Sequence, residues 1–172
     1  NKAIDKHPDS PDGYFGLGSL YLAMGNSTTA LEKFEIALEK DPAHTATRIK
    51  LAVYHFESGK HDLAEAQCKE LIRRKPGATD GYTYLANILT KRKRYDEAVM
   101  YLNYGLDKVP DEDQSAIYNG LGFIYLKKGE YGNSISYYEK ALELSPKDPT
   151  ISSVLAEVYF LDGQIARAQA IA

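Results

Sequence analysis

The sequence predicts an all-α fold in which pairs of antiparallel helices stack one after another, and three recurring features predict it. Prolines recur at an interval of 34 residues, at Pro8, Pro42, Pro76 and Pro110, and Pro146 follows after 36. A leucine followed by a small residue recurs at one phase, at Leu17-Gly18, Leu51-Ala52, Leu85-Ala86, Leu121-Gly122 and Leu155-Ala156. Another small residue follows each of these leucines 13 positions later, at Ala30, Ala64, Ala98, Ser134 and Ala168. Self-similarity at such a period is the signature of stacked repeat units.

The first half of each unit reads as one amphipathic helix, and residues 12–25 show why. Tyr14, Leu17, Gly18 and Tyr21 fall at i, i+3, i+4 and i+7, which places them on one helical face. Gly25 then ends the helix, because glycine adopts the left-handed conformation that a helix end requires.

A second helix completes the unit. Its caps are expected from Ser27, Thr28 and Thr29, and it ends at Asp41-Pro42 because proline disfavours helix in the residue before it. Its inner face comprises Ala30, Leu31, Phe34, Ala37 and Leu38. Gly18 is expected to face Ala30, so that the two helices can approach closely.

These residues give the chain a resemblance to the tetratricopeptide repeat family. The family's 34-residue pattern, W-x2-L-G-x2-Y, A-x3-F and P, is matched by Tyr14-x2-Leu17-Gly18-x2-Tyr21, Ala30-x3-Phe34 and Pro42. The fourth unit follows it with Tyr118, Leu121-Gly122, Tyr125, Ser134, Tyr138 and Pro146. Departures occur at Arg48, Ser152, His55, Leu89 and Leu71, so the second unit should pack differently. The resemblance implies a right-handed superhelical stack of helix hairpins.

The whole chain, 1–172, is interpreted as one tetratricopeptide array. Its units are residues 11–44, 45–78, 79–112 and 115–148, followed by a partial fifth, 149–172, with 1–10 as the tail of a preceding repeat. Asp113-Gln114 are interpreted as a two-residue loop insertion of low cost. Ile165, Ala168 and Ile171 would leave an apolar edge, and we expect the chain to be a segment of a longer array.

Composition and motifs narrow the possible chemistry. The chain lacks an apolar run long enough to span a bilayer, and Cys68, its single cysteine, permits no internal disulfide. The histidines His7, His44, His55 and His61 lack zinc-site spacing, so we expect neither metal nor cofactor. Cys68 occupies the Phe34 position and is interpreted as a packing thiol. The sequence predicts no enzyme activity in this segment.

Charge is distributed unevenly, although the whole chain carries only −3. Residues 69–94 hold eight Lys/Arg against Glu70 and Asp80, a local net charge of +6. Arg73–Lys75 end a second helix and Lys91–Arg94 end a first helix, so the two basic groups belong to opposite edges of an array. Basic residues near helix C-termini are also favoured by the helix dipole. We therefore expect no nucleic-acid partner, and a docking strip for an acidic partner stays open.

The resemblance implies where a protein or peptide ligand would bind. In this family the first helices of the units line a concave groove, and the corresponding peptide-binding residues are Phe15, Ser19, Ile49, Val53, Phe56, Thr83, Asn87, Asn119, Phe123 and Lys127. Phe15 and Ser19 replace the residues of the family's carboxylate clamp, so that clamp is not expected. Asn87 and Asn119 are suited to pairing with a peptide backbone. The alternative reading is that the aromatic residues only pack between helices.

The predicted function is a non-catalytic protein-interaction scaffold or adaptor that binds a peptide or protein segment in the groove. Two alternatives stay open: a structural module that self-associates through its repeat ends within a larger complex, and the targeting domain of a larger enzyme. The sequence identifies neither the partner nor the pathway, and an intracellular location is only the default.

Overall fold

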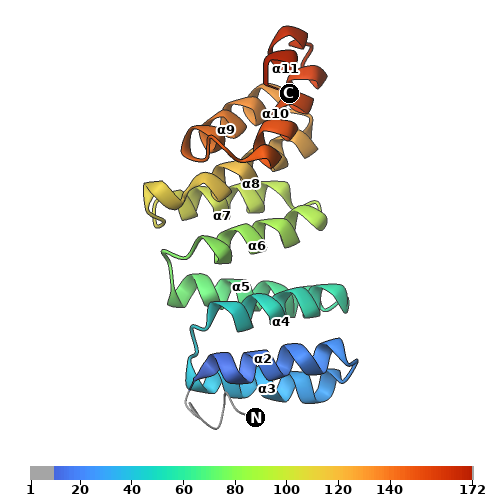
Figure 1. Cartoon of the computed structure of the whole chain (residues 1–172), viewed down its shortest axis with the longest axis vertical. Coiled ribbons are helices and arrows are strands. Elements are labelled where there is room, and N and C mark those ends of the chain that lie inside the picture. Colours follow the sequence, from blue (N-terminus) through green and yellow to red (C-terminus); the bar gives the residue numbers. More distant parts are fainter. Residues whose placement is uncertain (1–9, 172) are drawn as a thin grey trace. The chain divides into compact units, whose positions relative to one another are not determined.

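The computed structural model describes residues 10–171, and this part of the chain is helical throughout, with no β-strand (Figure 1). Its helices are α2 (Pro11–Ala23), α3 (Ser27–Lys40), α4 (Thr45–Glu57), α5 (His61–Arg74), α6 (Thr79–Lys91), α7 (Tyr95–Leu106), η1 (Asp111–Asp113), α8 (Ser115–Lys128), α9 (Tyr131–Leu144), α10 (Pro149–Leu161) and α11 (Ile165–Ile171). The expected helix tail before the first unit lies outside the described residues, apart from Ser10.

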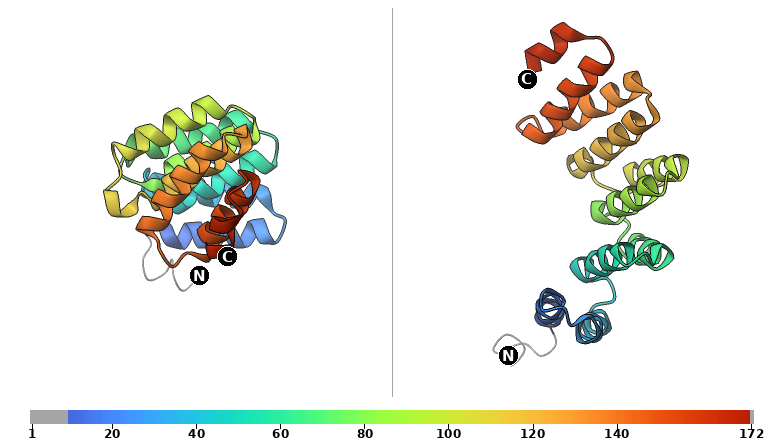
Figure 2. Two further views of the ribbon diagram at one scale, coloured as in Figure 1. Left: turned by 90° about the horizontal axis from the view of Figure 1, so that it is seen from above. Right: turned by 90° about the vertical axis from the view of Figure 1, so that its right-hand side faces the viewer.

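The chain divides into two compact units, residues 1–75 and 76–172. In the first, α2 pairs with α3 and α4 with α5, and α3 contacts α4. Figure 2 shows α2 and α3 lying side by side. Ala30, Phe34 and Leu51 form a buried cluster that joins the two hairpins, since Phe34 belongs to α3 and Leu51 to α4.

The second unit contains three successive hairpins: α6 with α7, α8 with α9, and α10 with α11. The helix α8 contacts both α6 and α7, and α10 contacts α9, so each hairpin packs on the one before it. The core between the last two hairpins includes Ile135, Tyr138, Leu155 and Val158. Ala168 and Ile171 of α11 pack against this core, whereas Ile165 is exposed.

The tight turn inside each hairpin has a left-handed residue. Glycine occupies four of these positions, with φ between 74° and 79° at Gly25, Gly59, Gly129 and Gly163. Lys93 occupies the fifth with φ of 60°, the one non-glycine residue with positive φ in the described chain. The expected end of the first helix at Gly25 is therefore present, and the third hairpin makes the same turn with a side chain.

Small residues in the first helices accommodate aromatic rings from the second helices. A β-carbon added to Gly18 would lie 2.5 Å from Phe34 Cε1, so the absence of a side chain at Gly18 makes room for the Phe34 ring. The same relationship recurs in the fourth hairpin between Gly122 and Tyr138. The second helix is capped by Asn26, whose side chain accepts from the Thr29 amide, and not by Ser27, Thr28 or Thr29.

The two-residue insertion before the fourth hairpin is an ordered element. Residues 111–113 form the 3₁₀ turn η1, and the buried Gln114 donates from Nε2 to the carbonyls of Leu106 and Val109 and to Asp111 Oδ1, each at 3.0 Å. Gln114 therefore pairs backbone groups at the end of α7, and the insertion stabilises the connection to α8.

Arg48 fills the place of a repeat aromatic by making an equivalent hydrogen bond. Its Nε donates to the Pro42 carbonyl at 2.7 Å. One repeat later, the Tyr82 hydroxyl donates to the Pro76 carbonyl at 2.8 Å. Arg48 also donates to Gln67 Oε1 at 2.9 Å, and it is only 7% exposed. The second unit thus keeps the backbone contact although it loses the ring.

Candidate binding groove

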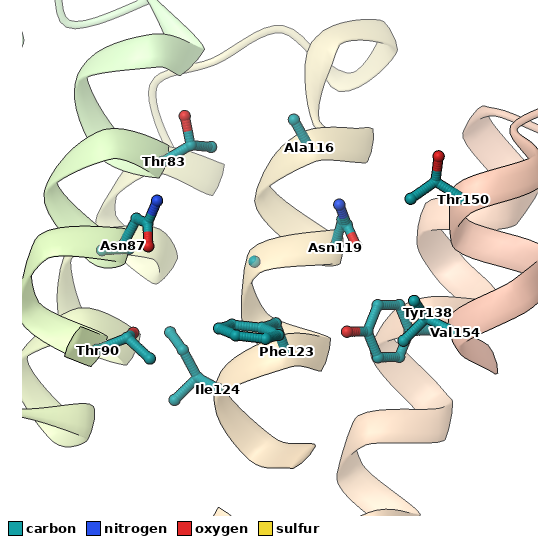
Figure 3. Close-up of a pocket in the computed structure, with 12 residues that line it drawn as sticks. Thr83, Asn87, Thr90, Ala116, Asn119, Phe123, Ile124, Tyr138, Thr150 and Val154 are labelled. Atoms are coloured by element: carbon teal, nitrogen blue, oxygen red, sulfur yellow. The ribbon is translucent and has the colours of Figure 1, made fainter. Parts of the chain in front are cut away.

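A groove of about 440 Å³ lies in the second unit, lined by the first helices of its three hairpins. The helices α6, α8 and α10 form its sides, and Tyr138 of α9 contributes from below (Figure 3). The lining residues are uncharged: Thr83, Ala86, Asn87, Thr90, Ala116, Asn119, Gly120, Phe123, Ile124, Tyr138, Thr150 and Val154. Four predicted binding residues, Thr83, Asn87, Asn119 and Phe123, are brought together in it.

Two side-chain amides provide the polar contacts between α6 and α8. Asn87 is exposed on α6 and Asn119 is half-buried on α8. Figure 3 shows both amides at the groove, on facing helices. Neither amide hydrogen-bonds another residue in the described part of the chain, so both keep donors and acceptors for a ligand. The Thr83 hydroxyl donates to the Thr79 and Asp80 carbonyls of its own helix, so its proton is already used in a hydrogen bond within the protein.

The part of the groove around Phe123 is mostly apolar. Phe123 is 40% exposed, and Ile124 and Val154 lie beside it. Lys127, the fifth predicted residue in this unit, lies one turn further along α8 and holds its ammonium 5.1 Å from the Phe123 ring centroid. That cation–π contact places a positive charge at the rim and leaves the lining neutral.

The remaining predicted residues lie in the first unit, on α2 and α4. Phe15 is half-buried and packs against Phe34 and His44, with ring centroids 6.1 and 5.8 Å apart. The Phe56 ring packs at a tilt against His61, the first residue of α5, with ring centroids 4.9 Å apart. Ser19, Ile49 and Val53 are also half-buried. The rings of Phe15 and Phe56 thus make packing contacts within this unit, and a role for them in ligand binding stays a prediction.

Several lining residues were absent from the predicted set. Ala86, Ala116, Gly120, Thr90 and Thr150 give no signal in a single sequence, because small residues also serve helix packing. Tyr138 did offer one: its repeat position carries Phe34, Cys68 and Leu102 elsewhere, so Tyr138 alone brings a hydroxyl there. Burial raises the pKa of Tyr138, and the charge of Glu157 raises it further, so this hydroxyl stays protonated as a donor.

Three other features of the described residues concern metal binding, membrane crossing and the cysteine thiol. Between residues 10 and 171, no group of three or more His, Cys, Asp and Glu side chains is placed to hold a metal ion. No helix in that range has the length and apolar character that a bilayer crossing requires. Cys68 is fully buried, and burial raises its thiol pKa to about 12, as a packing thiol requires.

Comparison with known families identifies the class of protein. Residues 1–45, 15–79 and 49–113 match a family model described as Tetratricopeptide repeat, and residues 115–148 match a second model with the same description. The chain therefore belongs to the tetratricopeptide repeat family. This confirms the predicted family and fold class, an all-α tetratricopeptide superhelix of antiparallel hairpins.

Individual relatives are distant, and the chain spans only part of them. The type IV pilus assembly protein PilF of Pseudomonas aeruginosa is 24% identical over 94% of this chain and 64% of its own length. The human protein O-mannosyl-transferase TMTC1 is 28% identical over 89% of this chain and 17% of its own length. Solved structures agree on the fold. The structure of Pseudomonas aeruginosa pilF gives a TM-score of 0.76 at 24% sequence identity, and the match covers 94% of this chain and 72% of that chain. Yeast Tom70 gives a TM-score of 0.84 at 22% sequence identity, and the match covers 99% of this chain and 36% of that chain.

Proposed function

We propose that the groove between α6, α8 and α10 binds an extended, uncharged peptide segment of a partner protein. Members of the tetratricopeptide repeat family are protein-interaction scaffolds, and they are generally non-catalytic. The observation that carries the finer proposal is the pair Asn87 and Asn119, whose amides meet one groove from facing helices.

The chemistry of the lining supports this ligand class. An extended peptide carries one donor and one acceptor per residue, and asparagine amides supply the matching acceptor and donor. Phe123, Ile124 and Val154 offer an apolar surface to one of its side chains. Because no lining residue is charged, burial of a charged ligand side chain there would be uncompensated and costly.

Self-association is a second candidate, favoured by an exposed apolar group at the last hairpin. Phe160 is 63% exposed, and Leu161 and Ile165 beside the same turn are exposed as well. This candidate predicts a concentration-dependent mass that Phe160→Ser abolishes. The reading as a targeting domain of a larger enzyme is supported only by the match to a named transferase, TMTC1.

The groove proposal is tested with a random dodecapeptide display library. Peptides selected on the purified protein are measured by fluorescence anisotropy against Asn87→Ala/Asn119→Ala. Loss of the amide contacts is expected to weaken binding roughly 10-fold or more. The matched control is Asn103→Ala, which removes the same group from an exposed position on α7 outside the groove. Selection of no peptide, or equal affinity of all variants, contradicts the proposal.

A further inference from the structure

The ring of Tyr138 packs in the core without the help of its hydroxyl. The ring lies over Gly122, in the position that Phe34 takes over Gly18 in the first hairpin. Phe34 shows that this packing needs no hydroxyl. The hydroxyl of Tyr138 is therefore not needed for packing, and its role depends on the groups toward which it is directed.

Figure 3 shows the Tyr138 hydroxyl directed toward Phe123, at the floor of the groove. Only 1% of the residue is exposed, and its hydroxyl makes no hydrogen bond within the described chain, but the oxygen is not one of the fully buried atoms that lack a partner. A hydroxyl that reaches the groove surface and has no partner in the protein is free to donate to a ligand. A ligand acceptor can approach the hydroxyl from the groove, since Tyr138 lines it while the ring belongs to the core between the last two hairpins.

Charge around the hydroxyl decides which acceptor suits it. Glu157 lies on α10, and its negative charge acts on Tyr138. A ligand carboxylate bonded to Tyr138 would be repelled by Glu157, and the only positive charge described beside Phe123, that of Lys127, lies at the rim and not among the groove-lining residues. A neutral carbonyl avoids both penalties and still accepts the hydrogen bond.

We infer that Tyr138 is a specificity-determining residue of the groove, donating its hydroxyl to a neutral carbonyl of a bound peptide beside the apolar surface of Phe123 and Val154. This inference rests on the proposed function, because it assigns a role within the same groove. The carbonyl belongs to the peptide backbone or to an Asn or Gln side chain. The charge of Glu157 disfavours an acidic side chain at that point.

The test uses the library-selected dodecapeptides on the whole chain with Tyr138→Phe. This variant keeps the ring over Gly122, so the protein should fold as before. Peptide affinity is expected to fall roughly 3- to 10-fold, the size of one hydrogen bond. The matched control is Tyr104→Phe, which removes a hydroxyl from an exposed tyrosine on α7. In addition, the Tyr138 Cζ carbon resonance should shift when peptide is added.

The outcomes separate the two claims. Peptides that lose affinity with Asn87→Ala/Asn119→Ala but bind Tyr138→Phe as well as the parent leave the groove proposal standing and overturn this inference. If no peptide binds the parent protein, both fail. Selection on Glu157→Gln gives the second readout: acidic residues should be depleted among peptides selected on the parent and less depleted on this variant. Equal depletion contradicts the role of Glu157.

Discussion

The ring of Tyr138 lies so close to Gly122 that a β-carbon on this glycine would stand 2.9 Å from ring atoms Cγ and Cδ2. The neighbouring Ser134 hydroxyl donates to the Gly122 carbonyl at 2.8 Å, which fixes the two helices of this hairpin at close range. The Leu-Gly element of the repeat is thus a steric requirement, because the adjacent aromatic ring occupies the space of a side chain.

Gly122→Ala is therefore expected to destabilise the protein by about 1–3 kcal/mol, the usual cost of overpacking a core. The measurement is urea unfolding followed by circular dichroism. Gly16→Ala is the control, since a β-carbon at this exposed position of α2 meets nothing within 4 Å. Replacing that helical glycine should stabilise by roughly 0.5–1 kcal/mol. Equal effects of the two changes would contradict the steric account.

Lys93→Gly is expected to stabilise the third hairpin. Lys93 holds a φ of 60° where the other four turns have glycine, and a left-handed conformation costs an L-residue about 1–2 kcal/mol. Glycine's larger unfolded-state entropy offsets part of that gain, so a net increase of roughly 0.5–1 kcal/mol should appear as a higher urea midpoint. The reverse change, Gly129→Lys at the equivalent turn, should lower the midpoint. A neutral or negative effect of Lys93→Gly would show that the lysine side chain stabilises this turn.

The sequence predicted the helices and hairpins well because their causes are local or periodic. Prolines, small residues and apolar faces recur with the repeat, so each unit supports the interpretation of the others. Two details depend on neighbours that periodicity does not show: the cap on Asn26 instead of Ser27–Thr29, and the buried amide of Gln114 within the two-residue insertion. Likewise, the groove role inferred for Tyr138 depends on which way a packed ring points its oxygen.

Arg48→Tyr should preserve most of the stability that Arg48→Met loses. Tyrosine at this position is expected to bond the Pro42 carbonyl as Tyr82 bonds the Pro76 carbonyl, whereas methionine leaves that carbonyl and Gln67 without their partner. The loss for Arg48→Met is about 1–3 kcal/mol by urea unfolding. Tyr82→Phe provides the reference value for a single bond of this type. If the tyrosine and methionine variants are equally unstable, the equivalence of the two hydrogen bonds is wrong.

His55 should make the stability of the protein depend on pH near neutrality. Burial lowers the pKa of His55, and the charge of Lys60 lowers it further, while its Nδ1 is buried without a partner in the described chain. The folded state therefore binds this proton less readily than the unfolded state, in which the pKa is about 6.5.

The contribution of neutral His55 to the free energy of unfolding is consequently fully present above that ordinary pKa. It is lost as the pH falls from about 6.5 toward the lowered pKa of the folded state. His55→Tyr, which restores the repeat tyrosine found at Tyr21 and Tyr125, removes the titrating group. Urea midpoints between pH 7.5 and 5.5 should fall less steeply in this variant than in the parent. His44 and His61 are present in both proteins, so the difference in slope reports His55 alone. Identical slopes would show that His55 gains its proton as easily folded as unfolded.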